Sequence, residues 1–194
     1  MPRLILASAS PRRIRLLQSA GFEAQVVPAS IAELDCAYLT PAELTLFNAY
    51  QKASSVAQRH RDRTVLGADT VVALDSQIFG KPNDLDTARR MLKALVGKTH
   101  EVVTGIVVID GPSGQFVVEA VRTTVAFREL SESQIEDYLK VVEPLDKAGA
   151  YAAQESPELI IRKTEGSFTN VIGLPMEVVT SILADFGMYP HCSN

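Results

Sequence analysis

Short apolar runs alternate with capped helical segments along the whole sequence, and this alternation restricts the fold more than any other feature. Leu4 to Leu6 is a strand-like run, and Ser10-Pro11 combines a helix-capping residue with proline at the first helical position. Further capping patterns occur at Thr40-Pro41 and at Ser131. Such alternation is typical of an α/β fold, in which helices pack on a sheet.

A long hairpin is predicted within this alternation. Two β-branched runs, Val102 to Ile109 and Phe116 to Phe127, flank the turn sequence Gly111-Pro112-Ser113-Gly114. The hairpin makes the predicted sheet mixed, with flanking helices. No repeat or linker interrupts the 194 residues, so we expect a single domain over residues 1–194, with two lobes around a cleft. The apolar faces of the predicted helices include Leu44, Phe47, Ala53, Leu85, Ala88, Leu92, Leu95, Ile135 and Tyr138.

The charge balance restricts the class of partner. The chain carries 23 acidic and 19 basic residues, a net charge of -4. Proteins that bind nucleic-acid backbones are normally basic, so we expect no nucleic-acid partner. A small anion is compatible with this balance, because it requires only a few cations at one place.

Hydropathy and cysteine usage indicate a cytoplasmic protein. No apolar run approaches the ~18 to 20 residues that a bilayer span requires, so no membrane partner is expected. The first residues lack the layout of a signal peptide. Cys36 and Cys192 are far apart and have no CxxC spacing, so we expect free thiols and no zinc site.

The turn from Ser8 to Arg13 is the first candidate site. Helix N-termini attract anions through their backbone N–H groups, and Arg12 and Arg13 add two guanidinium groups there. The turn has no glycine and is not a P-loop. A capped helix with two solvated arginines explains the spacing equally well.

Two further motifs are suited to phosphate chemistry, although each has a simpler explanation. Asp69, within Gly67 to Thr70 and between two strand-like runs, is a candidate metal ligand or general base. An aspartate that closes a turn is the commoner case. Lys81, in Gly80-Lys81-Pro82, is suited to phosphate, but lysines are mostly surface residues. Glu33 and Lys52 carry no individual signal.

Taken together and in order, these motifs give the chain a clear resemblance. It resembles the Maf family of nucleoside triphosphate pyrophosphatases over nearly its whole length. The matching segments are LILASASPRRIRLL from Leu4, QKA from Gln51, VLGADTVV from Val65, GKP from Gly80, KTHEVVTG from Lys98, TVAFREL from Thr124, EPLDKAGAY from Glu143 and EGSFTNVIGLP from Glu165.

The resemblance implies a two-lobed mixed-sheet fold related to that of inosine triphosphate pyrophosphatases, with the active site in the cleft. It implies hydrolysis of a nucleoside triphosphate to the monophosphate and pyrophosphate, with a divalent cation, Mg²⁺ or Mn²⁺. It also makes a homodimer plausible. The implied residues are Asp69, Lys81 and Glu33 for catalysis, Asp69 and Glu33 for the metal, and Ser8, Arg12, Arg13 and Lys52 for the phosphates.

Within this family, one branch acts on dTTP and UTP and another on 7-methyl-GTP. The chain resembles the first branch in Arg12, Thr70 and Gln154, which are implied to set base specificity, and it has no tryptophan. It departs from the family's glycine-rich pattern in Glu155 to Glu158, which bears on base selectivity. The alternatives are a 7-methyl-GTP pyrophosphatase and a non-enzymatic nucleotide-binding regulator of septum formation.

Overall fold

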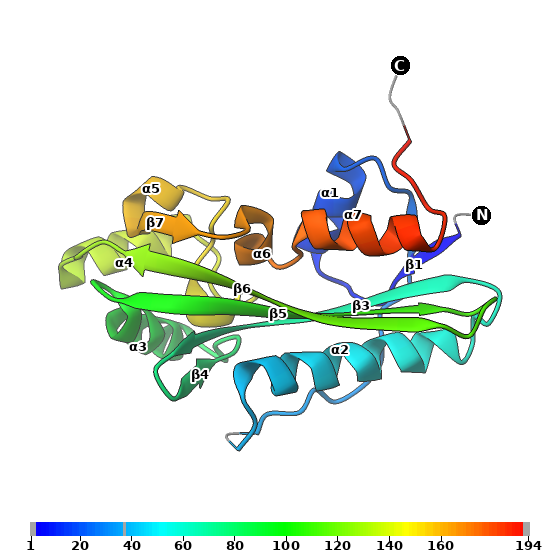
Figure 1. Ribbon diagram of the computed structural model, residues 1–194. Coiled ribbons are helices and arrows are strands. Elements are labelled where there is room, and N and C mark those ends of the chain that lie inside the picture. The colour runs from blue at the N-terminus through cyan, green and yellow to red at the C-terminus, as the bar shows by residue number, and fades with distance from the viewer. Residues whose placement is uncertain (1–2, 37, 192–194) are drawn as a thin grey trace. The chain divides into compact units, whose positions relative to one another are not determined.

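A mixed β-sheet with flanking helices forms the framework, as predicted (Figure 1). The computed structural model describes residues 3–36 and 38–191. The strand order is β2-β1-β3-β5-β6-β7, and β4 pairs with β3. The strands are β1 (Leu4–Leu6), β2 (Ala24–Val26), β3 (Thr64–Leu74), β4 (Gln77–Phe79), β5 (Thr99–Asp110), β6 (Phe116–Phe127) and β7 (Ile161–Glu165). The helices are α1 (Pro11–Ser19), α2 (Pro41–Ala57), α3 (Leu85–Leu95), α4 (Glu132–Val141), α5 (Pro157–Ile160), α6 (Phe168–Ile172) and α7 (Met176–Asp185).

Residue contacts divide the chain into two compact units. The first unit comprises the described parts of Met1–Asp69, Thr104–Val121 and Gly173–Asn194. The second comprises Thr70–Val103 and Arg122–Ile172. Strands β3, β5 and β6 contribute residues to both units. The single domain expected over residues 1–194 stays a prediction.

In the first unit, the short strand β1 has a helix layer on each face. It is parallel to both β2 and β3. Leu6 packs in one apolar cluster with Leu17 of α1 and Leu183 of α7, whereas Ile5 packs in another with Ala49 of α2. Successive side chains of a strand point to opposite faces, so the apolar run of β1 is buried on both sides. Figure 1 shows α2 on one side of these strands and α1 with α7 on the other.

Two glycines let α2 lie unusually close to the sheet. A Cβ at Gly67 of β3 would lie 2.9 Å from the Cβ of Ala53, and one at Gly105 of β5 would lie 2.5 Å from the nitrogen of Leu46. Both distances are too short for real side chains, so only glycine permits this approach. Asp69 lies two residues after Gly67 on the same strand and therefore faces α2 as well.

The second unit has its own apolar core and a charged surface seam. Leu92 of α3 and Tyr138 of α4 are buried in the same cluster. Along the surface, Arg89 of α3 forms an ion pair with Glu136 of α4. The hydrogen bond and charge of Glu136 raise the pKa of Arg89, so the guanidinium stays protonated. Strand β7 completes the unit by pairing antiparallel to β6.

The helix starts confirm the capping patterns, with one difference. Thr40 and Ser131 form complete capping boxes with Glu43 and Gln134. Ser10 is the N-cap of α1, as predicted, but its side chain makes no capping hydrogen bond.

Three other expectations were wrong. Phe47 and Leu85 are 43% and 52% exposed, so they do not belong to the buried faces of their helices. The turn expected at Gly67 to Thr70 is absent, because β3 runs unbroken from Thr64 to Leu74. Asp69 is therefore a mid-strand residue rather than a turn residue.

Cys36 is a partly buried free thiol, and Cys192 lies outside the described residues. Among residues 3–36 and 38–191, no helix is both long enough and apolar enough to cross a bilayer.

His100 of β5 is a buried titratable group in the core of the second unit. Its side chain packs edge-on against Phe127 and Tyr151, and its Nε2 lies 3.0 Å from the Tyr151 hydroxyl. Burial disfavours the charged imidazolium and lowers the pKa of His100 from 6.5 to about 4.

This shift predicts that stability falls with acidification. Between pH 6.5 and 4 the unfolded chain protonates His100 while the folded chain keeps it neutral. The free energy of unfolding should therefore fall across this window, by up to about 3 kcal/mol for this group. Urea unfolding at several pH values measures this effect. The free energy of unfolding should depend less steeply on pH in His100→Gln than in the unsubstituted chain. Equal slopes for the two proteins would contradict the assignment.

Candidate functional site

Two carboxylates in the first unit share one lysine ammonium. Asp69 and Lys52 are 6% and 7% exposed. The Nζ of Lys52 lies 2.8 Å from Oδ1 of Asp69 and 2.9 Å from Oε1 of Glu33. Glu33 belongs to the irregular segment after β2, and its side chain is 48% exposed. The structure therefore brings together three residues that carried separate signals, or none, in the sequence.

Asn48 of α2 holds the same two segments through its side-chain amide. Its Nδ2 donates to Oδ2 of Asp69 at 3.2 Å and to the carbonyl oxygen of Leu34 at 3.1 Å. Its Oδ1 accepts the N–H of Leu34 at 2.8 Å. The sequence interpretation missed Asn48. Its spacing of four residues from Lys52, which places both on one helix face, is the signal that was available.

Arg13 of α1 lies against the strand that carries Asp69. Its Nη1 donates to the carbonyl oxygen of Ala68 at 2.8 Å and to the hydroxyl of Ser8 at 3.2 Å, and its Nε donates to the carbonyl oxygen of Gly173 at 2.9 Å. Burial lowers the pKa of Arg13, while the nearby carboxylate of Asp69 acts in the opposite direction. Arg13 is therefore a fixed and buried cation beside Asp69. It is not one of the solvated arginines of the simpler explanation.

Ser8 completes the group in the turn before α1. Its hydroxyl accepts a hydrogen bond from the N–H of Ser10 at 3.2 Å and another from Nη1 of Arg13. Ser8 therefore fixes both the turn and the Arg13 side chain. We call the following six residues the Asp69 cluster: Ser8, Arg13, Glu33, Asn48, Lys52 and Asp69.

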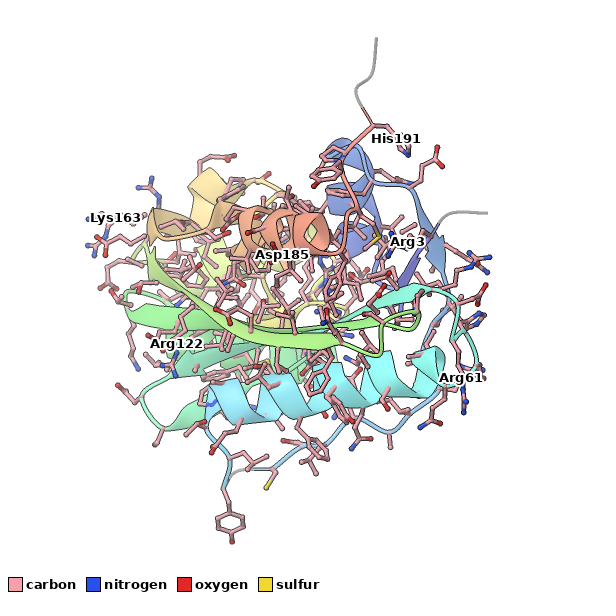
Figure 2. The ribbon with its side chains drawn as sticks, turned by 45° about the vertical axis from the view of Figure 1, so that its right-hand side comes forward. Arg3, Arg61, Arg122, Lys163, Asp185 and His191 are labelled. Atoms are coloured by element: carbon pink, nitrogen blue, oxygen red, sulfur yellow. The ribbon has the colours of Figure 1, made fainter. Side chains whose placement is uncertain are left out.

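Charge within the Asp69 cluster is locally balanced. Two carboxylates, of Asp69 and Glu33, accompany the two cations of Lys52 and Arg13. Other basic side chains of the first unit, such as Arg3 and Arg61, lie at its surface (Figure 2). A buried charge requires such pairing, because an unpaired charge in a low-dielectric interior is strongly unfavourable. The arrangement thus gathers buried cations without a basic overall composition.

The other predicted residues are placed as follows. Arg12 is partly exposed in the first turn of α1. Thr70 follows Asp69 on β3 and is partly exposed, whereas Lys81 and Gln154 are exposed residues of the second unit. The roles of Lys81 in catalysis and phosphate binding, and of Gln154 in base specificity, stay predictions.

A buried lysine lies close to Gln154 in sequence and was also missed. The Nζ of Lys147 donates to Oδ1 of Asp146 at 2.8 Å and to the carbonyl oxygen of Glu143 at 2.6 Å. It also lies 3.5 Å from Oε1 of Glu155. Glu155 belongs to the acidic segment that stands in place of the family's glycine-rich pattern. An ion pair therefore links this segment to Lys147, which precedes Gln154.

One position in the Asp69 cluster is suited to a cation. An oxygen of Asp69 and an oxygen of Glu33 converge on the ammonium of Lys52, so two oxygen ligands already face one positive charge. Mg²⁺ is commonly held by one or two carboxylates together with phosphate oxygens and water. The pair Asp69 and Glu33 fits such a cation. Within the described part of the chain, no group of three or more His, Cys, Asp or Glu side chains is arranged to hold a metal.

The burial of the two ion pairs predicts different effects on stability. Lys52→Met leaves the buried carboxylate of Asp69 without its cation, which should lower the free energy of unfolding by about 3 kcal/mol. Glu33→Gln should change it by less than about 1 kcal/mol, because that side chain is half exposed. Urea denaturation of both variants measures these values. A larger loss for Glu33→Gln than for Lys52→Met would contradict the geometry.

Several proteins of known name are similar to this chain over nearly its whole length. A protein from Geobacter sp. (strain M21), named dTTP/UTP pyrophosphatase, is 48% identical over 180 residues, which cover 92% of this chain and 93% of that protein. Proteins of the same name from Moorella thermoacetica and Bacillus cereus (strain G9842) are 44% and 41% identical. They cover 97% and 96% of this chain, and the same shares of their own lengths. The family model described as Maf-like protein matches residues 3–186. The chain therefore belongs to the Maf-like protein family.

Proposed function

We propose that the chain is a nucleoside triphosphate pyrophosphatase that hydrolyses dTTP and UTP to the monophosphate and pyrophosphate. The observation that carries this proposal is the Asp69 cluster, in which the buried cations of Arg13 and Lys52 lie beside two carboxylates. The substrates are proposed from the names of the three relatives, each of which covers more than nine-tenths of this chain.

The charges of the cluster suit hydrolysis of a phosphoanhydride. A nucleoside triphosphate is strongly anionic, and its hydrolysis depends mainly on positioning and electrostatic stabilisation. Release of pyrophosphate requires cleavage of the bond between the α- and β-phosphates, and in our proposal water attacks the α-phosphorus. In our proposal Asp69 orients the attacking water and accepts its proton, while Arg12, Arg13, Lys52 and Lys81 bind the phosphates together with Ser8.

A divalent cation, Mg²⁺ or Mn²⁺, belongs to the proposal. Asp69 and Glu33 would hold it at the position on which their oxygens converge, with the ammonium of Lys52 displaced from that position toward the phosphates. Such an ion supplies a lowered water pKa and neutralises phosphate charge. Lys52 would then neutralise phosphate oxygens, since a lysine ammonium acts as a point charge on phosphate.

Base recognition is proposed for Gln154, with contributions from Thr70 and Arg12. A glutamine amide offers both a donor and an acceptor, which matches the O4 and N3–H edge of uracil or thymine. The pairing of Glu155 with buried Lys147 favours this role, because it restrains the segment that carries Gln154. The proposal also includes a cytoplasmic location and a homodimer, and light scattering tests the latter.

Replacement of the acidic group tests the role of Asp69. Asp69→Asn should lower pyrophosphate release from dTTP by at least about a thousandfold, because the amide cannot accept the proton of the attacking water. The fold should persist, since an amide of the same size replaces the carboxylate. The matched control is Asp185→Asn, an exposed position on α7 (Figure 2), which should retain full activity.

The assay is product-resolved and covers dTTP, UTP, dGTP and 7-methyl-GTP, with Mg²⁺ or Mn²⁺ and with chelator. Pyrophosphate from dTTP and UTP that disappears with chelator supports the proposal. Preferred turnover of 7-methyl-GTP would assign the chain to that specificity instead. Nucleotide binding without pyrophosphate release would indicate a non-enzymatic regulator. Substantial turnover by Asp69→Asn would refute the role of Asp69.

A second variant tests base recognition. Gln154→Ala should reduce the ratio of kcat/KM for dTTP to that for dGTP by about tenfold or more, because a pair of base-edge hydrogen bonds is lost. The control is Glu158→Ala, an exposed residue of the same segment, which should leave this ratio unchanged. An unchanged ratio in Gln154→Ala would remove Gln154 from the proposal.

A further inference from the structure

Asn48 is a buried polar residue whose contacts all belong to the segments that carry the two carboxylates. It is 3% exposed and lies on the face of α2 that packs on the sheet. Its two contacted residues are Asp69 itself and Leu34, the neighbour of Glu33. An asparagine is a weaker helix former than leucine, and its amide is costly to bury without partners. Packing alone therefore does not explain an asparagine at this position.

The hydrogen bond from Asn48 helps to orient the Asp69 carboxylate. Lys52 donates to Oδ1 at 2.8 Å, and Asn48 donates to Oδ2 at 3.2 Å. The two donors lie four residues apart on α2, so they project from the same helix face. With one donor on each oxygen, the plane of the carboxylate is fixed relative to the helix.

The hydrogen bonds between Asn48 and Leu34 also bear on the position of Glu33. Residues 27–36 form neither helix nor strand, so no ladder of backbone hydrogen bonds holds this segment. Asn48 pairs with both the N–H and the carbonyl oxygen of Leu34, as a neighbouring strand would. This double contact fixes the backbone beside Glu33, whose own side chain is half exposed.

We propose that Asn48 is a positioning residue for the reaction, whose single amide sets the placement of the Asp69 and Glu33 carboxylates relative to each other. This inference rests on the proposed function, in which both carboxylates act on the same substrate. Catalytic groups misplaced by about 1 Å cost up to roughly a hundredfold in rate, so loss of the amide should be visible in turnover.

The first test compares Asn48→Leu with Thr45→Val on the same helix. Thr45 is also fully buried and polar, but it donates only to carbonyl oxygens within α2, those of Pro41 and Ala42. We expect Asn48→Leu to lower kcat for dTTP about ten- to a hundredfold while KM changes less than threefold. Thr45→Val should leave both constants unchanged, whatever its effect on thermal stability. Unchanged kcat in Asn48→Leu, or an equal loss in Thr45→Val, would overturn the proposal.

A double-mutant cycle separates positioning from a general loss of packing. If Asn48 acts through Glu33, then Asn48→Leu should lower kcat much less in a Glu33→Gln background than in the unsubstituted chain. Independent effects that multiply would show that Asn48 does not act through Glu33 and would contradict this part of the proposal.

Hydrogen exchange gives a readout that does not depend on turnover. In Asn48→Leu the amide of Leu34 should lose protection, while amides in the middle of α2 stay protected. Retained protection at Leu34 would refute the proposed contact even if the chain proves inactive on every nucleotide. Absence of activity in the unsubstituted chain, with loss of protection in Asn48→Leu, would refute the proposed function and with it the catalytic role of Asn48.

Discussion

The chemistry of the first unit depends on how closely α2 lies on β3. At Gly67 the helix approaches so closely that no side chain fits between helix and strand. Side chains of ordinary length, Lys52 and Asn48, therefore reach a carboxylate that projects from the strand itself. The strand alternation that turns Gly67 toward the helix also turns Asp69 toward it. One packing contact thus places the acid and both of its donors.

This closeness also explains how the cluster tolerates so much buried charge. Asp69 is buried away from water. The ammonium of Lys52, the amide of Asn48 and the nearby guanidinium of Arg13 take the place of that water. Arg13 is in turn fixed by the backbone carbonyl of Ala68, next to the acid. Preorganised groups of this kind require little rearrangement when a charged ligand binds, which is the main source of electrostatic catalysis.

Much of the local structure could be predicted from the sequence, because capping boxes and apolar alternation act over a few residues. The starts of α2 and α4 followed from Thr40 and Ser131. Asp69 was a candidate metal ligand or general base from its place between two strand-like runs, but its strand was read as broken, since glycine and aspartate usually mark turns. Asn48 was missed because its role depends on a close contact between distant segments. Phe47 is exposed because it lies outside the buried face of α2, which combines the polar residues Thr45, Asn48 and Lys52 with Ala49 and Ala53.

The seam between α3 and α4 matters for how such a protein evolves and is engineered. Arg89 and Glu136 join these helices at the surface of the second unit, and neither helix contributes a residue to the Asp69 cluster. At Gly67, by contrast, the contact between α2 and β3 also positions Lys52 and Asp69. A substitution that changes the packing there therefore also changes the placement of the chemical groups. Adaptation to heat is therefore more accessible through charge networks like this seam, where substitutions alter thermal tolerance without displacing the chemical groups.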